Sequence, residues 1–192
     1  MVDWDFFRIF ANWSDLYRQG SARRATVTPS KQEMEKLVVH NDEFFAQVVA
    51  QLENGKRVTI PVKGVSMLPF IRGERDLVEL TAPDRTQLKR DDIVLFRTHG
   101  RWIMHRILKI ENGIATIQGD GVWRGKEVVS VNQIHGKAVS ILRKGVSPRD
   151  PYRPGELGLV HAWQRLGGLR RYILAIYRRL FRIRITVEKA NV

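Results

Sequence analysis

Apolar side chains between residue 30 and about residue 53 recur every three or four positions, which is the period of an α-helix. Ser30 with Glu33 forms a capping-box pattern at the start, and Asn54-Gly55 provides a stop. The side chains expected to face inward are Leu37, Phe44, Phe45, Val48, Val49 and Leu52. The spacing therefore predicts one amphipathic helix over about 30–53.

Residues 1–20 carry a second helical pattern that is rich in aromatic side chains. Its repeating face consists of Phe6, Phe10, Trp13 and Tyr17. Such a face packs either on a protein core or on lipid, and the pattern does not separate the two. A polar stretch over 21–29 follows, so residues 1–55 are predicted as an N-terminal helical segment.

From residue 56 the pattern changes to short runs rich in β-branched residues. Six runs are expected to form strands: 57–62, 76–80, 92–97, 101–110, 114–118 and 134–142. Residues 98–100 and 111–113 are predicted as hairpin turns, the second because of its Asn-Gly pair. The sequence therefore predicts an α+β protein with a compact, mostly antiparallel β domain over 56–145, flanked by helices.

The region after this domain returns to a helical period. Gly and Pro residues are frequent over 143–156, so 146–156 is predicted as a linker. Apolar side chains then recur at intervals of three and four from Glu156 to about Arg182, with Arg on the other faces. Residues 157–192 are therefore predicted as a basic amphipathic helix and tail.

Charge is unevenly distributed along the chain. Lys and Arg number 33 against 20 Asp and Glu, which gives a formal net charge of +13. Seven Arg and no acidic residue lie between Leu157 and Val187. Such a segment binds an anionic membrane surface, binds nucleic-acid phosphates, or packs its apolar face on the β domain. The wide apolar stripe favours the membrane or the core, and nucleic acid is not expected as a partner.

The composition excludes several kinds of chemistry. The chain has no Cys, so disulfides, thiol catalysis and Cys-ligated metals are ruled out. His40, His99, His135 and His161 are scattered without metal-ligand spacing. We therefore expect no metal and no cofactor.

Two further features bear on where the protein works. No stretch of about 18 apolar residues occurs, so we expect no membrane-spanning helix. The N-terminus lacks the basic start and continuous apolar block of a signal peptide. The expected location is the cytoplasm or the inner face of a membrane as a peripheral protein, and the oligomeric state is left open.

The loop between the predicted strands 57–62 and 76–80 contains Ser66 together with a Gly and a Pro that determine the backbone conformation. Gly64 permits a close approach of another chain, and Pro69 fixes the exit direction, so the loop is either a tight turn or a platform for a nucleophile. A Ser hydroxyl becomes a nucleophile only when a neighbouring base takes its proton. Ser66, His105 and Asp120 supply a hydroxyl, a base suited to neutral pH and an acid that orients it.

Four short segments carry a family resemblance. Residues 64–69, Gly-Val-Ser-Met-Leu-Pro, resemble the nucleophile box of the signal peptidase I and LexA-like serine peptidases. Residues 92–96, Asp-Ile-Val-Leu-Phe, resemble the box that follows it in that superfamily. Residues 105–107, His-Arg-Ile, resemble the box that carries a His in the archaeal and endoplasmic-reticulum type of signal peptidase, and Gly119-Asp120 resembles the closing box. Order and spacing agree, and the resemblance covers about residues 57–143.

The resemblance implies a serine endopeptidase that cleaves a leader or precursor peptide through an acyl-enzyme. Ser66 would be the nucleophile and one oxyanion donor through its backbone N–H, His105 the general base and Asp120 the orienting acid. Where the His-type enzymes carry a second Asp, this chain offers only Glu127. The residues implied to line a groove for an extended peptide are Gly64, Val65, Met67 and Pro69. A non-catalytic peptide-binding module of the same fold and a LexA-like regulatory or self-cleaving protein remain as alternatives.

Overall fold

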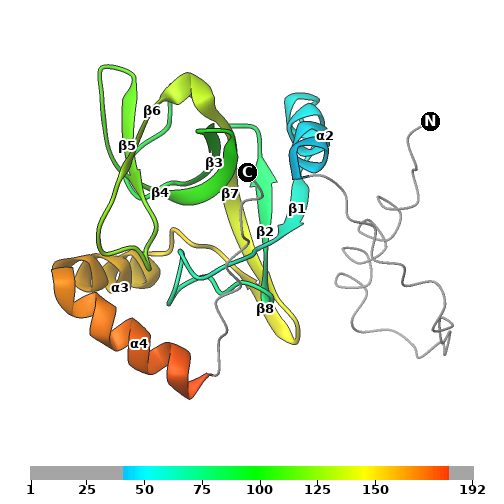
Figure 1. The fold of residues 1–192 in the computed structure, drawn as a ribbon. Coiled ribbons are helices and arrows are strands. Elements are labelled where there is room, and N and C mark those ends of the chain that lie inside the picture. The colour runs from blue at the N-terminus through cyan, green and yellow to red at the C-terminus, as the bar shows by residue number, and fades with distance from the viewer. Residues whose placement is uncertain (1–40, 182–192) are drawn as a thin grey trace, which may run out of the picture. The chain divides into compact units, whose positions relative to one another are not determined.

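The computed structural model divides the chain into two units, residues 1–40 and 41–192, and describes residues 41–181 (Figure 1). Its helices are α2 (Asn41–Glu53), α3 (Pro154–Arg165) and α4 (Arg170–Leu180). Its strands are β1 (Val58–Pro61), β2 (Asp76–Thr81), β3 (Ile93–Thr98), β4 (Arg101–Glu111), β5 (Ile114–Gln118), β6 (Glu127–Ser130), β7 (Ile134–Arg143) and β8 (Val146–Arg149). The expected aromatic face over 1–20 and the capping box at Ser30 lie outside the described residues.

The strands form one antiparallel sheet in the order β1-β2-β7-β3-β4-β5-β6, with β8 paired to β7. This confirms the predicted α+β class with a mostly antiparallel sheet. All six predicted strands are present, each within one residue of its expected ends. Strand β2 alternates between buried and half-buried positions because one of its faces packs on the core, whereas the first four residues of β3 are all buried.

Two apolar clusters hold the sheet. Val48 and Leu52 of α2 are buried against strand residues such as Leu80 and Leu95. Phe45 stacks on Trp102 of β4 with ring centroids 5.2 Å apart. The second cluster lies among β3, β4, β5 and β7 and consists of Leu88, Val94, Phe96, Ile107, Ala115, Ile117, Val129 and Ile134. Helix α2 thus ends at Glu53 as predicted, with its last two turns anchored in the core.

Tyr152 closes the gap where β3 and β7 separate. Its hydroxyl accepts a hydrogen bond from the Ile93 N–H at 3.2 Å and donates one to the Ala138 carbonyl at 2.7 Å. Burial raises the pKa of Tyr152 well above its ordinary value, although the hydrogen bond from Ile93 acts in the opposite direction. The phenol therefore stays protonated and acts as a structural link.

Two expectations about the second half of the chain were wrong, and one strand was missed. Residues 146–149 form β8 instead of a linker, because Gly145 at φ +75° makes a tight turn back onto β7. The predicted single C-terminal helix is two helices, since Gly167 at φ +51° interrupts the α-helical backbone between α3 and α4. Strand β6 was not predicted, because its four residues are too short to show a period.

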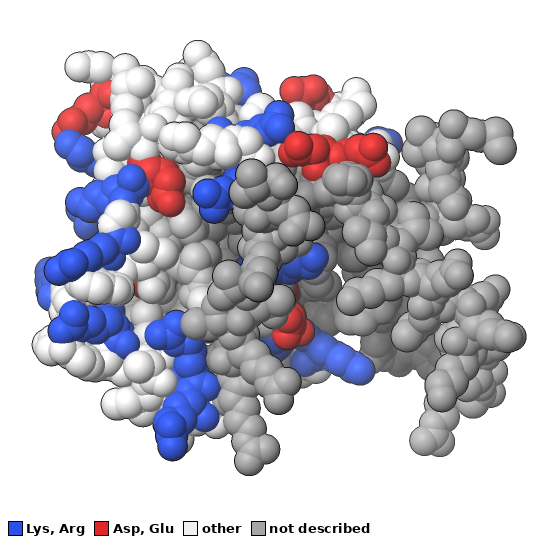
Figure 2. Space-filling model, in the orientation of Figure 1, with Lys and Arg blue, Asp and Glu red and all other residues white. Residues whose placement is uncertain are grey.

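Basic side chains gather on one side of the described surface. In Figure 2 blue atoms line the left and lower left of the view, the side on which α3 and α4 lie in Figure 1. Within residues 41–181 no helix is long and apolar enough to cross a membrane.

Candidate active site

Ser66 lies in the loop that joins β1 to β2. The loop is closed by hydrogen bonds from Glu74 N to Val62 O at 2.9 Å and from Gly73 N to Gly64 O at 3.2 Å. Gly64 has φ +80°, a conformation that a residue with a side chain rarely adopts. The loop therefore has a fixed conformation, because its backbone is closed by hydrogen bonds within the loop.

Asp76 anchors the base of this loop. Its buried carboxylate accepts hydrogen bonds from the side chains of Arg75 and Arg143, both at 2.8 Å, and from the Arg72 N–H at 2.9 Å. Burial by itself would raise the pKa of Asp76, but these hydrogen bonds outweigh it and hold the pKa below its ordinary value. Asp76 therefore stays ionised and has a structural role.

Apolar side chains of the loop fix the position of Ser66. Met67 and Ile71 are buried in the cluster beneath α2, and Leu68 packs with Trp163 and Leu174 of the C-terminal helices. Ser66 itself is half-buried between these anchors. Gly64, Val65 and Pro69 reach the surface, but the Met67 side chain is only 2% exposed, so it packs in the core and does not face a groove.

Glycines allow the backbone that follows β5 to lie directly against the Ser66 loop. The Gly121 N–H donates to the Ser66 carbonyl at 2.7 Å. A Cβ added to Gly119 would lie 2.4 Å from that same carbonyl oxygen and 2.8 Å from Nε2 of His105. Residue 119 must therefore lack a side chain, because the Ser66 backbone and the His105 ring both occupy the space beside its Cα.

His105 of β4 is 5% exposed and has a carboxylate partner. Its Nδ1 lies 3.2 Å from Oε2 of Glu127 at the start of β6. Burial lowers the pKa of His105, while the Glu127 and Asp120 carboxylates act in the opposite direction without cancelling it. The ring is therefore neutral near pH 7, with Nδ1–H donating to Glu127 and Nε2 left as an acceptor beside Gly119.

Asp120 has a different partner from the one implied by the family resemblance. Its carboxylate receives three hydrogen bonds from Arg106, at 2.8 Å, 2.9 Å and 3.3 Å, and both side chains are 1% exposed. His105 and Arg106 are neighbours in a strand and point to opposite faces, so Asp120 pairs on one face while Glu127 reaches the ring on the other. The hydrogen bond on the His105 ring that was assigned to Asp120 is made by Glu127.

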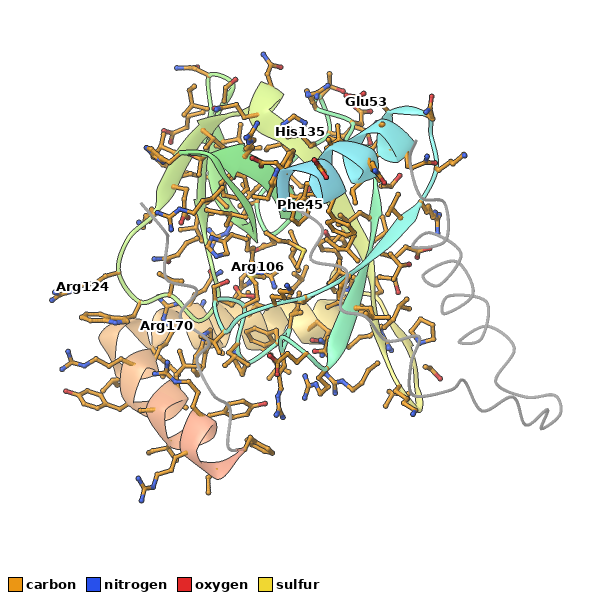
Figure 3. The ribbon with its side chains drawn as sticks, turned by 45° about the vertical axis from the view of Figure 1, so that its right-hand side comes forward. Phe45, Glu53, Arg106, Arg124, His135 and Arg170 are labelled. Carbon is orange, nitrogen blue, oxygen red and sulfur yellow. The ribbon has the colours of Figure 1, made fainter. Side chains whose placement is uncertain are left out.

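The Arg106–Asp120 pair belongs to a larger buried network. Arg106 also donates to the Asp91 carbonyl at 2.9 Å, and the Trp163 indole donates to the Asp120 carbonyl at 2.7 Å. Figure 3 shows Arg106 inside the domain, between the sheet and α3. This network holds Asp120, the residue next to Gly119, and thereby supports the contact with the Ser66 loop.

Ser66 and His105 are not joined by a hydrogen bond among the described residues. In serine enzymes without ligand this bond is often long, and it tightens when substrate binds. No group of three or more metal-ligating side chains occurs within 41–181. The arrangement is a hydroxyl on a rigid loop beside a neutral, carboxylate-held imidazole.

Sequence reasoning named Ser66 and His105 as candidates and Asp120 as the acid, with Glu127 as the possible substitute that the structure pairs with the ring. Glu127 lies 22 residues after His105 and was noted only as the one acid in 121–127. The unpredicted strand β6 pairs with β5 and brings Glu127 opposite Ile117, one strand away from β4, from where its side chain reaches the His105 ring. Glu127 would have been found by predicting β6.

Comparison with models of known protein families finds no match. A search of curated proteins also finds none. The case for a function therefore comes from the four sequence boxes and from the geometry around Ser66 and His105.

Proposed function

We propose that the protein is a serine endopeptidase in which Ser66 is the nucleophile, His105 the general base and Glu127 the group that orients the base. The observation that carries this proposal is the setting of His105. Its ring is buried and neutral, its Nδ1 is held by Glu127, and its Nε2 faces the backbone that carries Ser66. A histidine held in this manner is suited to take a proton from a hydroxyl.

The chemistry follows from these positions. The Ser66 hydroxyl turns toward Nε2 and gives up its proton as Oγ attacks the peptide carbonyl carbon. The resulting imidazolium is stabilised by Glu127, and the Ser66 N–H donates to the developing oxyanion. His105 then protonates the leaving amine, and water activated by the same ring hydrolyses the Ser66 ester.

An exposed strand edge beside Ser66 supports a peptide as the substrate. Within the described sheet β1 pairs only with β2, so its other edge offers free N–H and C=O groups. This edge leads directly into Gly64, Val65 and Ser66. A leader or precursor peptide would add there as an extended strand, with main-chain hydrogen bonds setting its register.

Asp120 has a supporting role in this scheme. Its carboxylate is fully engaged by Arg106, so it is not free to orient His105. It still lies close enough for its charge to favour the protonated ring. Asp120 therefore positions Gly119 and contributes to the field at His105.

A peptide-binding module without catalysis is the second candidate, and the observation that favours it is the missing hydrogen bond between Ser66 and His105 in the described structure. A LexA-like regulator is the third and differs in taking its own chain as substrate. Cleavage of the purified chain that is lost in Ser66→Ala identifies this third case.

A serine-reactive fluorophosphonate separates the first two candidates. The wild type should be labelled at Ser66 at neutral pH, whereas Ser66→Ala and His105→Ala should lose labelling. His161→Ala is the matched control, because His161 also pairs with a carboxylate, Asp91 at 2.9 Å, but on α3. An unlabelled, folded wild type would leave the binding module as the better description. Cleavage of a peptide library by the wild type and not by Ser66→Ala would establish peptidase activity.

A further inference from the structure

Helix α4 has two apolar faces, and only one of them packs on the domain. With 3.6 residues per turn, Arg170, Leu174 and Tyr177 lie on one face. Leu174 is 4% exposed and packs with Leu68 and Trp163, so this is the inward face. Its burial accounts for the attachment of α4 to α3 and to the loop that carries Ser66.

The second apolar face points away from the domain. It consists of Leu169, which directly precedes the helix, Ile173, Ile176 and Leu180, with exposed fractions of 61%, 42%, 60% and 73%. These residues recur at intervals of three and four and form one continuous line. We call this line the outer stripe. Its exposure leaves several large aliphatic side chains in contact with water, which marks an interaction surface.

The rest of the surface of α4 is cationic. Arg171, Arg178 and Arg179 occupy the remaining side of α4, and Arg165 ends α3. Among described residues from 154 onward, Glu156 is the one acidic side chain, and it is paired with Arg149. The surface that carries the stripe therefore has positive charge without local compensation.

The loop after β5 extends the same surface. Arg124 and Arg171 both lie over the Trp123 ring, at 4.2 Å and 5.2 Å from its centroid. Figure 3 shows Arg124 and Arg170 beside the start of α4. A hollow of about 390 Å³ there has Arg90, Lys109, Lys126 and Arg170 among its lining residues and no carboxylate.

We infer that the outer stripe and its arginines bind an anionic lipid bilayer, with α4 lying in the plane of the interface. Aliphatic side chains would enter the boundary between headgroups and acyl chains, while the guanidinium groups contact lipid phosphates. A nucleic acid would use the arginines but leave the stripe in water. A second copy of this chain would cover the stripe but would bring two arginine-rich surfaces together. The inference does not depend on the proposed peptidase activity.

Vesicle co-sedimentation of the full chain, carrying Ser66→Ala, tests this inference. We expect binding to vesicles of phosphatidylcholine with phosphatidylglycerol and little binding to phosphatidylcholine alone. The double variant Ile173→Ser/Ile176→Ser should weaken the apparent affinity about tenfold or more, because it removes apolar area from the interface. The control is Ile114→Ser/Val128→Ser on β5 and β6, whose residues are similarly exposed at 44% and 65%.

A second pair of variants tests the charges. Arg171→Gln/Arg179→Gln should weaken binding by about fivefold for each Arg, with the loss greatest at low salt. Arg101→Gln/Lys144→Gln removes the same charge elsewhere on the exposed surface and should have little effect.

Several outcomes would overturn the inference. They are absence of vesicle binding, equal binding to neutral and anionic vesicles, or an Ile173→Ser/Ile176→Ser chain that binds like the wild type. Duplex DNA binding without vesicle binding would assign the surface to nucleic acid. If the wild type is a dimer that does not bind vesicles, and the Ile173→Ser/Ile176→Ser variant is a monomer, the stripe is an interface with a second copy.

Discussion

Replacing Gly119 by Ala tests whether the contact among Gly119, Ser66 and His105 is as tight as described. The new Cβ would lie 2.4 Å from the Ser66 carbonyl oxygen and 2.8 Å from Nε2 of His105. Ordinary contacts of a Cβ begin at 3.4 Å, so the Ser66 loop must retreat by about 1 Å. The backbone at Gly119 does not have a positive φ, and the effect is therefore steric.

A displacement of this size has separate consequences for activity and stability. Misplacing reacting groups by about 1 Å costs on the order of 100-fold in rate, so labelling of Ser66 by the fluorophosphonate should slow by about that factor. Overpacking a well-filled site costs about 1–3 kcal/mol of folding free energy. For a chain of this length, each kcal/mol lowers Tm by about 2–4 °C.

The assay compares labelling rates and thermal unfolding of Gly119→Ala with those of Gly158→Ala. Gly158 lies in α3, and a Cβ added there would meet nothing within 4 Å. Gly158→Ala should retain the wild-type labelling rate and gain roughly 0.5–1 kcal/mol from helix propensity. If Gly119→Ala is labelled at the wild-type rate and unfolds at the wild-type Tm, the described contact between β5 and the Ser66 loop is wrong.

Four further predictions separate the carboxylates and test the core. Asp120→Asn should lower the free energy of unfolding by about 3–5 kcal/mol, measured in urea, because it leaves the buried Arg106 without its counter-charge. Glu127→Gln should lower the pKa of His105 further in an NMR titration and slow labelling, and an upward shift would refute the assigned pair. As pH falls below about 6.5, His105 gains its proton in the unfolded chain before it does so in the folded chain. The free energy of unfolding should therefore fall with pH in the wild type, and this part of the fall should be absent in His105→Gln. Tyr152→Phe should cost about 1–3 kcal/mol in the same urea assay, and no change would mean that water replaces the hydroxyl.

The spacing of apolar residues predicted the helices and strands in which buried and exposed side chains alternate regularly. Strand β5 was predicted at its observed ends because its turns and its alternation agree. The break at Gly167 was missed because the apolar period continues across it, although the backbone does not. Residues 146–149 were read as a linker because Pro and Gly are frequent there, yet a turn at Gly145 suffices for a hairpin.

Contacts between distant segments set the limit for predicting the site. Ser66, His105 and Glu127 lie far apart in the sequence, and the sequence does not indicate whether Asp120 or Glu127 faces the His105 ring. Which carboxylate meets the ring depends on the opposite directions in which the His105 and Arg106 side chains leave β4. Asp120 pairs with Arg106 because a buried guanidinium requires a counter-charge. Spacing along the chain contains neither fact, so it left open whether Asp120 or Glu127 pairs with His105.

Leu68, Trp163 and Leu174 connect the surface proposed for lipid with the loop that carries Ser66. Leu174 is on the inward face of α4, Leu68 is two residues from Ser66, and all three side chains are buried together. Trp163 also donates to the Asp120 carbonyl, next to Gly119. A bilayer beneath the outer stripe would therefore hold Ser66 in a fixed orientation to the lipid surface. For the peptidase proposed above, this linkage would bring Ser66 to precursor peptides that leave the same surface.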